Sequence, residues 1–273
     1  MQAIDVSVII STYNQPKWLE NVLWSYNYQT YKNFEVVIAD DGSTETTKIM
    51  IDNMSKLVNF PIKHIWHADK GFRKTTILNK ATLASVGAYL VFTDGDCIAR
   101  NDFLQSHINK REVGYCLSGG YFKLPLTISK LITKTDIETQ DCFKIDWLKH
   151  HGLKKTFKSN KLTSRGFKEY FLNTFTTTKA TFDGMNVSGW KANIIEVNGF
   201  DERMEYGGED REIGERLVNL GIKFKQIRYS AICLHLYHER DYVKPEMIEK
   251  NKKIRAITKQ QKVKQTPFGI KKL

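Results

Sequence analysis

Short apolar runs alternate with amphipathic stretches through the first hundred residues of the chain. Four of these runs predict strands, over 6–10, 34–39, 62–66 and 88–93, the first of them buried. Apolar positions at helical spacing predict three helices: one from Pro16, one capped by Ser43 and Thr44 that extends to about residue 58, and one over 74–86 before Gly87. This alternation predicts an α/β fold with a mostly parallel, Rossmann-like central sheet and helices on both of its faces.

The second half of the chain has a less regular pattern. Residues 128–182 are rich in Lys, Thr and aromatic side chains with weak helical periodicity, which predicts a helical insertion. Regular elements return after it: a helix from Glu209 to about Leu220, and strands near 223–227 and 230–235. We therefore expect one domain over 1–243, composed of a half 1–127, the insertion 128–182 and a half 183–243, followed by a basic helix or tail over 244–273.

The charge of the chain is uneven. Lys and Arg outnumber Asp and Glu by 42 to 30 in 273 residues, which gives a net charge of +12 and a pI near 9.4. The excess lies in two segments, 144–179 with nine basic and two acidic residues, and 244–273 with ten and two. The remainder is slightly acidic and carries no reading-helix or base-stacking motif. We therefore expect no nucleic-acid partner, although charge alone would suggest one.

Other features of the sequence concern the compartment. No run of about 18 apolar residues occurs, and the first residues lack the pattern of a signal peptide, so we expect a cytoplasmic protein. Four widely spaced cysteines without a Cys-x-x-Cys pair predict reduced, buried thiols. Apolar residues lie among lysines between 245 and 264. That pattern fits peripheral contact of 244–273 with an anionic membrane, and it fits a solvated helix equally well.

Acidic residues follow two of the predicted strands directly. Asp94-Gly95-Asp96 comes after the fourth strand, and two carboxylates separated by glycine can hold a divalent cation whose other positions stay open to phosphate oxygens. Asp40-Asp41 follows the second strand, where one carboxylate could accept an N–H from a base or bond a ribose hydroxyl, or simply form a turn. Open α/β sheets bind ligands at the carboxyl ends of their strands.

Two further motifs lie in the second half. Gly207 and Gly208 permit close backbone approach before the carboxylates of Glu209 and Asp210, which can supply a general base or simply favour a helix N-terminus. Glu212 is the structural member of this acidic group. His235 and His238 follow a strand and can ligate a metal, support a ligand or fill a partly buried polar site.

Four of these segments occur in an order that resembles the family 2 glycosyltransferases with the GT-A fold. They are Val6 to Asn14, Ala39 to Ser43, Thr93 to Asp96, and Gly184 to Leu220. The last segment resembles the C-terminal half of galactosyltransferases and N-acetylgalactosaminyltransferases, and of bacterial chondroitin-polymerase-like and lipopolysaccharide or capsule enzymes. The resemblance covers roughly 4–110 and 184–240.

The resemblance implies a role for each matching residue. It places Ser11, Tyr13, Asn14, Asp41, Arg73, Asp94 and Gly95 around a nucleotide, with Tyr13 near uracil and Asp41 accepting its imide N–H. It implies that Asp96 and His238 bind Mn²⁺ or Mg²⁺, with Asp94 supporting the metal and His235 behind it. It implies that Asp210 is the catalytic base, that Glu209 and Gly208 contact the acceptor, and that Trp190 forms a wall against the sugar.

The implied activity is inverting transfer of a hexose or N-acetylhexosamine, galactose or N-acetylgalactosamine first, from a UDP-sugar to a glycan or lipid-linked acceptor. Two departures from the family pattern bear on it: Cys97 follows the Asp-x-Asp motif where many relatives are acidic, and the 74–86 helix lacks an expected arginine. A nucleotidyltransferase, and a non-catalytic basic adaptor that binds RNA or anionic membrane, are the alternatives. The first would usually show a glycine-rich phosphate loop, and the second rests on charge alone.

Overall fold

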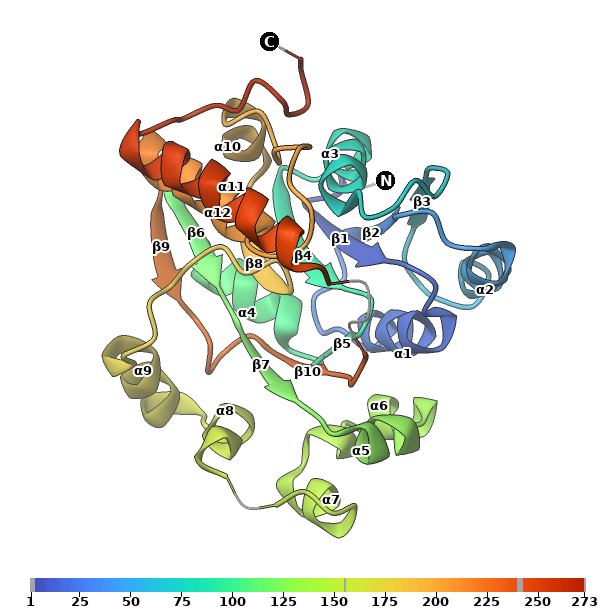
Figure 1. Ribbon diagram of the computed structural model, residues 1–273. Helices are drawn as coiled ribbons and strands as arrows, with labels where there is room; N and C mark the ends of the chain where they lie inside the picture. The colour runs from blue at the N-terminus through green and yellow to red at the C-terminus, as the bar shows by residue number, and fades with distance from the viewer. Residues whose placement is uncertain (1–2, 155, 240–242, 273) are drawn as a thin grey trace.

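The computed structural model describes residues 3–154, 156–239 and 243–272. Within these residues, a seven-stranded sheet forms the centre of the molecule in the order β3-β2-β1-β4-β8-β6-β9 (Figure 1). Its strands are β1 (Val6–Thr12), β2 (Phe34–Asp40), β3 (Ile62–Trp66), β4 (Tyr89–Asp94), β6 (Tyr115–Ser118), β8 (Asn186–Trp190) and β9 (Lys223–Gln226). The strands β1 to β4 are parallel, whereas β8 runs antiparallel to β4 and β6. The predicted α/β fold with a mostly parallel sheet is confirmed.

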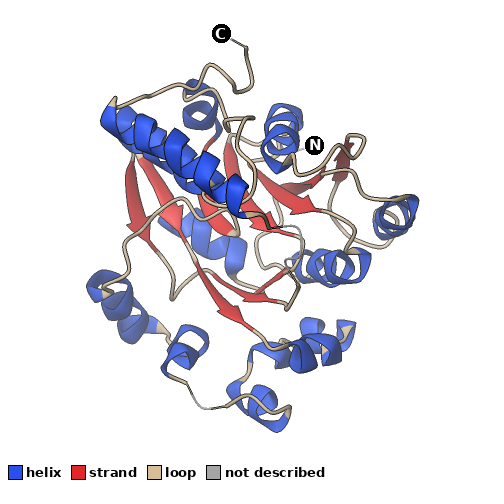
Figure 2. Cartoon of the chain, in the orientation of Figure 1, coloured by secondary structure: helices blue, strands red, loops and turns tan. Residues whose placement is uncertain are grey.

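Helices cover both faces of this sheet because β1 is apolar on both sides. Val8 and Ile10 of β1 join one apolar cluster, and Ile9 joins the other. The first cluster includes side chains of α1 (Pro16–Asn27), α2 (Glu45–Met54) and α4 (Phe103–Lys110). The second includes side chains of α3 (Lys74–Ala84), α10 (Lys191–Glu196) and α11 (Glu209–Leu220). Figure 2 shows the strands enclosed between these helices.

Two predicted helix ends are wrong by a few residues. The helix α2 ends at Met54 rather than near 58, because the chain turns there with Leu57 donating to the Met54 carbonyl. The helix α3 ends at Ala84, which lets Gly87 pass within contact of the β1 backbone at Ser7, where any side chain would collide. Thr44 occupies the N-cap position of α2, but its side chain makes no capping hydrogen bond.

A second, small sheet joins distant parts of the chain. Its order is β5-β10-β7, from β5 (Cys97–Ala99), β10 (Ile232–His235) and β7 (Gly120–Lys123). Antiparallel pairing of β5 with β10 places Cys97 opposite His235. This pairing brings the end of the Asp94–Asp96 turn to His235, the last residue of β10, and to His238 just beyond it. The sequence pattern did not predict β5 or β7, because strands of three or four residues carry little periodicity.

The predicted helical insertion is present. It contains α5 (Leu126–Leu131), α6 (Lys134–Glu138), α7 (Ile145–His150), α8 (Asn160–Thr163) and α9 (Gly166–Phe175), with short 3₁₀ turns η1 (Asp141–Phe143) and η2 (Phe157–Ser159). Ile128, Ile137 and Leu148 bury their side chains in the first apolar cluster. The helices α8 and α9 lie at the edge of the molecule in Figure 1.

The C-terminal segment is bound to the rest of the fold. Its helix α12 (Pro245–Gln260) packs along α11, where Arg255 pairs with Glu215 at 2.5 Å and Thr258 donates to Glu212 at 2.8 Å. Beyond α12, the amide of Asn198 donates to the carbonyls of Thr266 and Lys271. No helix in the described part of the chain is both long and apolar enough to cross a membrane.

A buried ion pair anchors α11 to the loop before it. The Arg216 side chain is fully buried and donates to both carboxylate oxygens of Glu212 and to the carbonyls of Val197 and Gly199. The structural role predicted for Glu212 is confirmed.

We expect Arg216→Met to lower the free energy of unfolding by about 3–5 kcal/mol, because it leaves the Glu212 carboxylate buried without its partner. Urea titration followed by circular dichroism measures this loss. Lys48→Met, which removes one partner of an exposed pair with Glu45, is the control and should cost less than about 1 kcal/mol. Equal stability of the two variants would contradict the expectation.

Candidate active site

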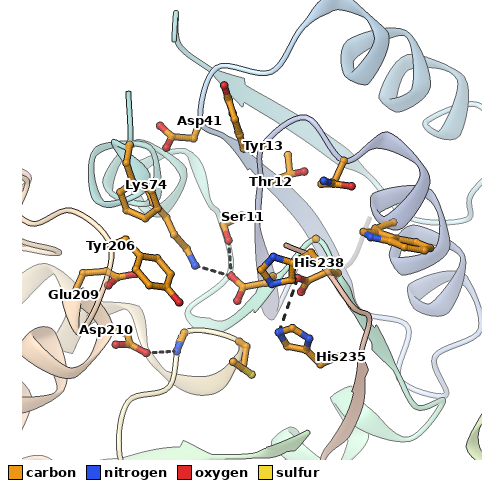
Figure 3. A pocket seen from close by; sticks show the side chains of 18 of the residues that line it. Ser11, Thr12, Tyr13, Asp41, Lys74, Tyr206, Glu209, Asp210, His235 and His238 are labelled. Atoms are coloured by element: carbon orange, nitrogen blue, oxygen red, sulfur yellow. Dashed lines mark hydrogen bonds and ion pairs between the residues drawn. The ribbon is translucent and has the colours of Figure 1, made fainter. Parts of the chain in front are cut away.

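A cleft of about 1160 Å³ opens at the carboxyl ends of β1, β2 and β4. Its walls come from the β1–α1 loop, the turn after β4, the loop before α11 and the segment that follows β10. Figure 3 shows labelled side chains of β1, the start of α3, the loop before α11 and the end of β10 around one space, among them Ser11, Lys74, Tyr206 and His235. Because ligand pockets commonly measure about 300–1,000 Å³, this cleft has room for a nucleotide-sized ligand and part of a second one.

Two loops on one side of the cleft, after β1 and after β2, are tied together by Asn14. Its backbone N–H donates to the Ser43 hydroxyl at 2.8 Å, and its side-chain carbonyl accepts from the Thr44 N–H at 2.9 Å. Asn14 has φ +48°, a left-handed conformation that asparagine tolerates better than most residues. The neighbouring Tyr13 is half exposed, lines the cleft and donates its hydroxyl to Asp69.

Asp41 follows β2, lines this side of the cleft and is held by hydrogen bonds with two groups of the protein. One carboxylate oxygen is 2.7 Å from His67 Nε2, and the other accepts the backbone N–H of Arg73 at 2.9 Å. Burial raises the pKa of Asp41, and these two hydrogen bonds oppose the rise. His67 is a site residue that the sequence did not single out, since it belongs to no motif.

Arg73 was predicted to lie around the ligand, but its side chain does not reach the cleft. Its guanidinium donates to the Ala68 carbonyl at 2.7 Å, and its side chain is not among the residues that line the described part of the cleft. The next residue, Lys74, lines the cleft instead, because α3 begins there and turns that side chain inward.

Lys74 supplies a cation among the carboxylates of the cleft. Its ammonium lies 2.7 Å from Asp94, whose same oxygen accepts the Ser11 hydroxyl at 2.6 Å. Burial alone would raise the pKa of Asp94, but the Lys74 charge and the Ser11 hydrogen bond outweigh it and hold that pKa below its usual value. The one sequence signal for Lys74 was a cation in a first helical turn, where the helix dipole disfavours it.

Asp96 faces two histidines across the small sheet. Its Oδ2 lies 3.2 Å from His238 Nε2 and 3.9 Å from His235 Nε2. The Nδ1 of each imidazole lies beside a backbone carbonyl, Leu236 for His235 and Glu239 for His238. A carbonyl only accepts, so each Nδ1 carries the proton and each Nε2 can present a lone pair toward Asp96.

These residues fit a divalent cation, because a lone pair and a carboxylate that face each other need a proton or a metal between them. The potential ligand atoms of Asp96, Cys97 and His235 lie within 4.8 Å of one another. Carboxylate and imidazole ligands suit Mn²⁺ better than Mg²⁺, which prefers oxygen. Burial raises the pKa of the Cys97 thiol well above its usual value, which keeps it a weak ligand.

On the opposite side of the cleft, α11 presents Glu209 and Asp210. Gly207 and Gly208, with φ +104° and +96°, turn the chain into this helix in a conformation that favours glycine. Asp210 accepts the Gly184 N–H at 3.1 Å, as Figure 3 shows. Burial and the neighbouring Asp210 raise the pKa of Glu209 to about 7, against the opposing charge of Lys74.

The helix α12 supports this turn from outside the cleft. The Asn251 amide donates to the carbonyls of Glu205 at 2.8 Å and Gly207 at 3.2 Å. Side-chain atoms of Ile248 and Arg255 lie 3.2 and 3.1 Å from where a Cβ on Gly207 and Gly208 would be. The C-terminal segment therefore holds the loop that carries the two carboxylates.

Trp190 does not form a wall of the cleft. It lies four residues beyond the cleft end of β8, a separation of about 13 Å along a strand. Its ring packs against Tyr89, and its indole N–H donates to the Glu112 carbonyl. Asp183, Gly184 and Met185 line that side of the cleft instead. Every other predicted site residue except Arg73 lies in the cleft: Ser11, Tyr13, Asn14, Asp41, Asp94, Gly95, Asp96, Gly208, Glu209, Asp210 and His238.

The mostly parallel sheet, the Asp-x-Asp turn at its ligand edge, the histidine beside Asp96 and the acidic residues across the cleft form the arrangement that the resemblance to GT-A glycosyltransferases implied. Comparison with known proteins agrees. Residues 7–122 match the model for glycosyl transferase family 2, and residues 172–239 match a model described as the N-terminal domain of galactosyltransferase. Both models describe glycosyltransferases, so the chain carries a segment similar to family 2 over 7–122 and one similar to a galactosyltransferase domain over 172–239.

Curated relatives are similar over most of this chain. Validoxylamine A glucosyltransferase of Streptomyces hygroscopicus subsp. jinggangensis is 27% identical over 248 residues, which cover 87% of this chain and 56% of the relative. Chondroitin synthase of Escherichia coli is 25% identical over 249 residues, which cover 84% of this chain and 34% of the relative. This chain thus spans about half or less of the length of these proteins.

Solved structures share the fold at low sequence identity. TarS 1–349 of S. aureus, in complex with UDP-GlcNAc, has a TM-score of 0.62 at 17% identity, covering 94% of this chain and 69% of that one. The mannosyltransferase PcManGT from Pyrobaculum calidifontis, in complex with GDP-Man and Mn²⁺, has a TM-score of 0.57 at 17% identity, covering 89% and 59%.

Proposed function

We propose that this chain is an inverting, metal-dependent transferase that moves a hexose or N-acetylhexosamine from a UDP-sugar to a hydroxyl of a glycan acceptor. The observation that carries the proposal is the convergence of Asp96, His235 and His238 in the same cleft as Glu209 and Asp210. Asp96 and the two histidines suit a metal beside a diphosphate, and the two carboxylates of α11 suit removal of a proton. The match of 172–239 to a galactosyltransferase model favours galactose or N-acetylgalactosamine.

In this reaction the protein has to remove a proton from the acceptor and neutralise the leaving group. Asp210 takes the proton of the acceptor hydroxyl as that oxygen attacks the anomeric carbon, and the bond from this carbon to the diphosphate breaks on the opposite face. A direct displacement of this kind inverts the anomeric centre and needs no protein nucleophile. Asp96 and His238 would hold a Mn²⁺ or Mg²⁺, which would supply Lewis-acid neutralisation of the leaving diphosphate.

The remaining groups bind and orient the donor. In this proposal Tyr13 and Asp41 bind the base, and Ser11, Asn14 and Gly95 bind near the phosphates; all five residues line the cleft. Asp94 stays ionised because of Lys74, so it can accept a hydrogen bond from a ribose hydroxyl. Glu209, with a pKa of about 7, contacts the acceptor hydroxyls beside Gly208. The acceptor is a growing cell-surface polysaccharide, lipopolysaccharide or capsule, in some cases carried on a lipid.

UDP and Mn²⁺ together should stabilise the protein against thermal unfolding. At a ligand concentration 100 times its dissociation constant we expect about 2.7 kcal/mol, measured as a rise in Tm. EDTA should remove most of this rise, because the diphosphate then faces Asp94 and Asp96 without a cation. His238→Ala should bind Mn²⁺ more weakly while unfolding at the same Tm in the absence of ligand.

The function itself is tested by metal-dependent hydrolysis of a panel of sugar nucleotides. We expect UDP-galactose or UDP-N-acetylgalactosamine to be hydrolysed fastest, with GDP-mannose as the contrasting nucleotide. Faster hydrolysis of GDP-mannose would contradict the proposed UDP preference. Salt-sensitive RNA binding without any response to UDP would instead favour a basic adaptor, and pyrophosphate release from a nucleoside triphosphate would favour a nucleotidyltransferase.

Contact of 244–273 with an anionic membrane stays a prediction. The face of α12 toward α11 is polar, with Asn251 and Thr258 buried, while Ile257 and several lysines face outward. Its contacts with the loop before α11 give this segment a structural role that does not require a membrane.

A further inference from the structure

The helix α9 presents its apolar side to solvent and its polar side to the protein. Phe167, Tyr170, Phe171 and Phe175 are 81%, 67%, 47% and 67% exposed, and α9 has no buried residue. A helix on the surface of a globular protein normally turns such a stripe toward the core. The orientation of α9 is therefore the reverse of the usual one.

Hydrogen bonds of the polar side hold α9 in this orientation. The Asn173 side chain accepts from the Tyr229 N–H at 2.9 Å and donates to the Ser230 hydroxyl at 2.8 Å. The Ser230 hydroxyl in turn donates to Glu169, which also lies 3.5 Å from the Lys110 ammonium. Because Glu169 and Asn173 are one turn apart, their fixed contacts leave the aromatic residues on the outer side.

The exposed rings form one continuous strip. The ring centroids of Phe167 and Phe171 lie 6.5 Å apart, and those of Phe171 and Phe175 lie 4.6 Å apart. Phe157 of the neighbouring turn η2 is 77% exposed. Large contiguous apolar patches of this kind on a folded protein mark an interaction surface.

Basic residues border this strip. The exposed charged side chains of the adjoining segment are mostly cationic: Lys154, Lys158, Arg165, Lys168 and Lys179. The acidic residue of α9, Glu169, faces Lys110 and Ser230. A surface with aromatic side chains at its centre and cations around it matches the interface of an anionic lipid bilayer, where rings enter the headgroup region and lysines contact lipid phosphates.

We propose that this surface, formed by the exposed residues of η2 and α9, docks the protein onto an anionic membrane. A second copy of the chain is a poorer occupant, because two such surfaces would bring like charges together. The rings also contact one another along the helix, rather than standing apart as platforms for single-stranded bases.

This docking surface lies close to the cleft along the chain. Phe175 precedes Asp183, a residue of the cleft wall, by eight residues, or at most about 28 Å of extended chain. A bilayer bound at α9 would thus lie within reach of the acceptor side of the cleft. Delivery of a lipid-linked acceptor rests on the proposed function, whereas membrane docking does not.

Sedimentation with vesicles tests the proposal. We expect the full chain to bind vesicles that contain phosphatidylglycerol and to bind phosphatidylcholine vesicles far more weakly. Phe171→Ser with Phe175→Ser should weaken binding roughly tenfold or more, since two rings no longer enter the interface. Lys158→Gln with Lys168→Gln should lower the preference for the anionic lipid. Both double variants alter exposed side chains and should keep the wild-type Tm and UDP-sugar hydrolysis.

Two controls separate this surface from others. Leu83→Ser removes an exposed apolar side chain of α3, and Lys252→Gln with Lys253→Gln removes charge from α12; both should bind vesicles as the wild type does. The proposal is overturned if the chain does not bind anionic vesicles, or if the α12 variant alone loses binding. It is equally overturned if the Phe171 and Phe175 variant changes only self-association, measured by light scattering, or only RNA binding.

Discussion

Asp210→Asn is expected to lower the rate of sugar transfer by about 10²–10⁴-fold, the usual contribution of a general base. The amide has nearly the shape of the carboxylate, and its carbonyl oxygen can still accept the Gly184 N–H, so the loop before α11 should keep its conformation. What the amide cannot do is take a proton from the acceptor hydroxyl. Transfer is measured with a radiolabelled donor, and donor binding by isothermal titration with UDP.

Glu209→Gln is the matched control for this prediction, because it removes the neighbouring carboxylate and leaves the proposed base, Asp210, unchanged. Burial raises the pKa of Glu209 to about 7, so its charge changes across the neutral range. We expect this variant to bind acceptor more weakly and to keep more turnover than Asp210→Asn. A larger loss of turnover in Glu209→Gln than in Asp210→Asn, together with loss of the acid limb near pH 7 in the pH profile of kcat, would assign the base to Glu209 instead.

Lys74→Met is expected to have the second large effect, a fall in kcat/KM of about 10²–10³-fold, as seen when one fixed electrostatic donor is removed from an active site. The Lys74 ammonium touches Asp94, and its charge also lowers the pKa of Glu209. Without it both carboxylates gain protons more readily, so the pKa of Glu209 moves above about 7. Because Glu209 contacts the acceptor in the proposed function, the acid limb of kcat/KM for the acceptor should therefore move to higher pH.

Lys74→Arg is the control, since it keeps the positive charge while changing its shape. It should leave the acid limb near its wild-type position and recover part of the lost activity. The proposed role of Lys74 would be wrong if Lys74→Met changed the rate without moving the limb. Far-ultraviolet circular dichroism checks that Lys74→Met keeps α3, because Thr75 and Asn79 hold that helix through separate contacts with Met204 and Phe200.

Most of the first half of the fold could be predicted from the sequence. The strands β1, β2 and β4 are largely apolar runs of six or seven residues, and the helices between them bury one face, so most of these elements carry a local signal. The Asp94–Asp96 turn and Asp41 could be placed at one edge because parallel strands end on the same side of a sheet.

The rest of the site depends on pairing between distant segments. Pairing of β5 with β10 brings Asp96 to His235 and His238, and no local pattern determines that register. The prediction for Arg73 was wrong because the first inward side chain of α3 is Lys74, a difference of one position on a helix. Trp190 was misplaced because β8 runs antiparallel and carries it away from the cleft.

By itself, the sequence determined the α/β class, the acidic edge of the sheet and the location of the positive charge in two segments. Only the tertiary structure decided which side is covered in the helices α9 and α12 of these two segments. In α12, Asn251 and Thr258 form hydrogen bonds beside α11, so this helix supports the loop before α11. In α9, Glu169 and Asn173 form hydrogen bonds with Ser230, which leaves the aromatic side exposed. Helical periodicity shows that two faces exist, but the groups that cover one face come from distant parts of the chain.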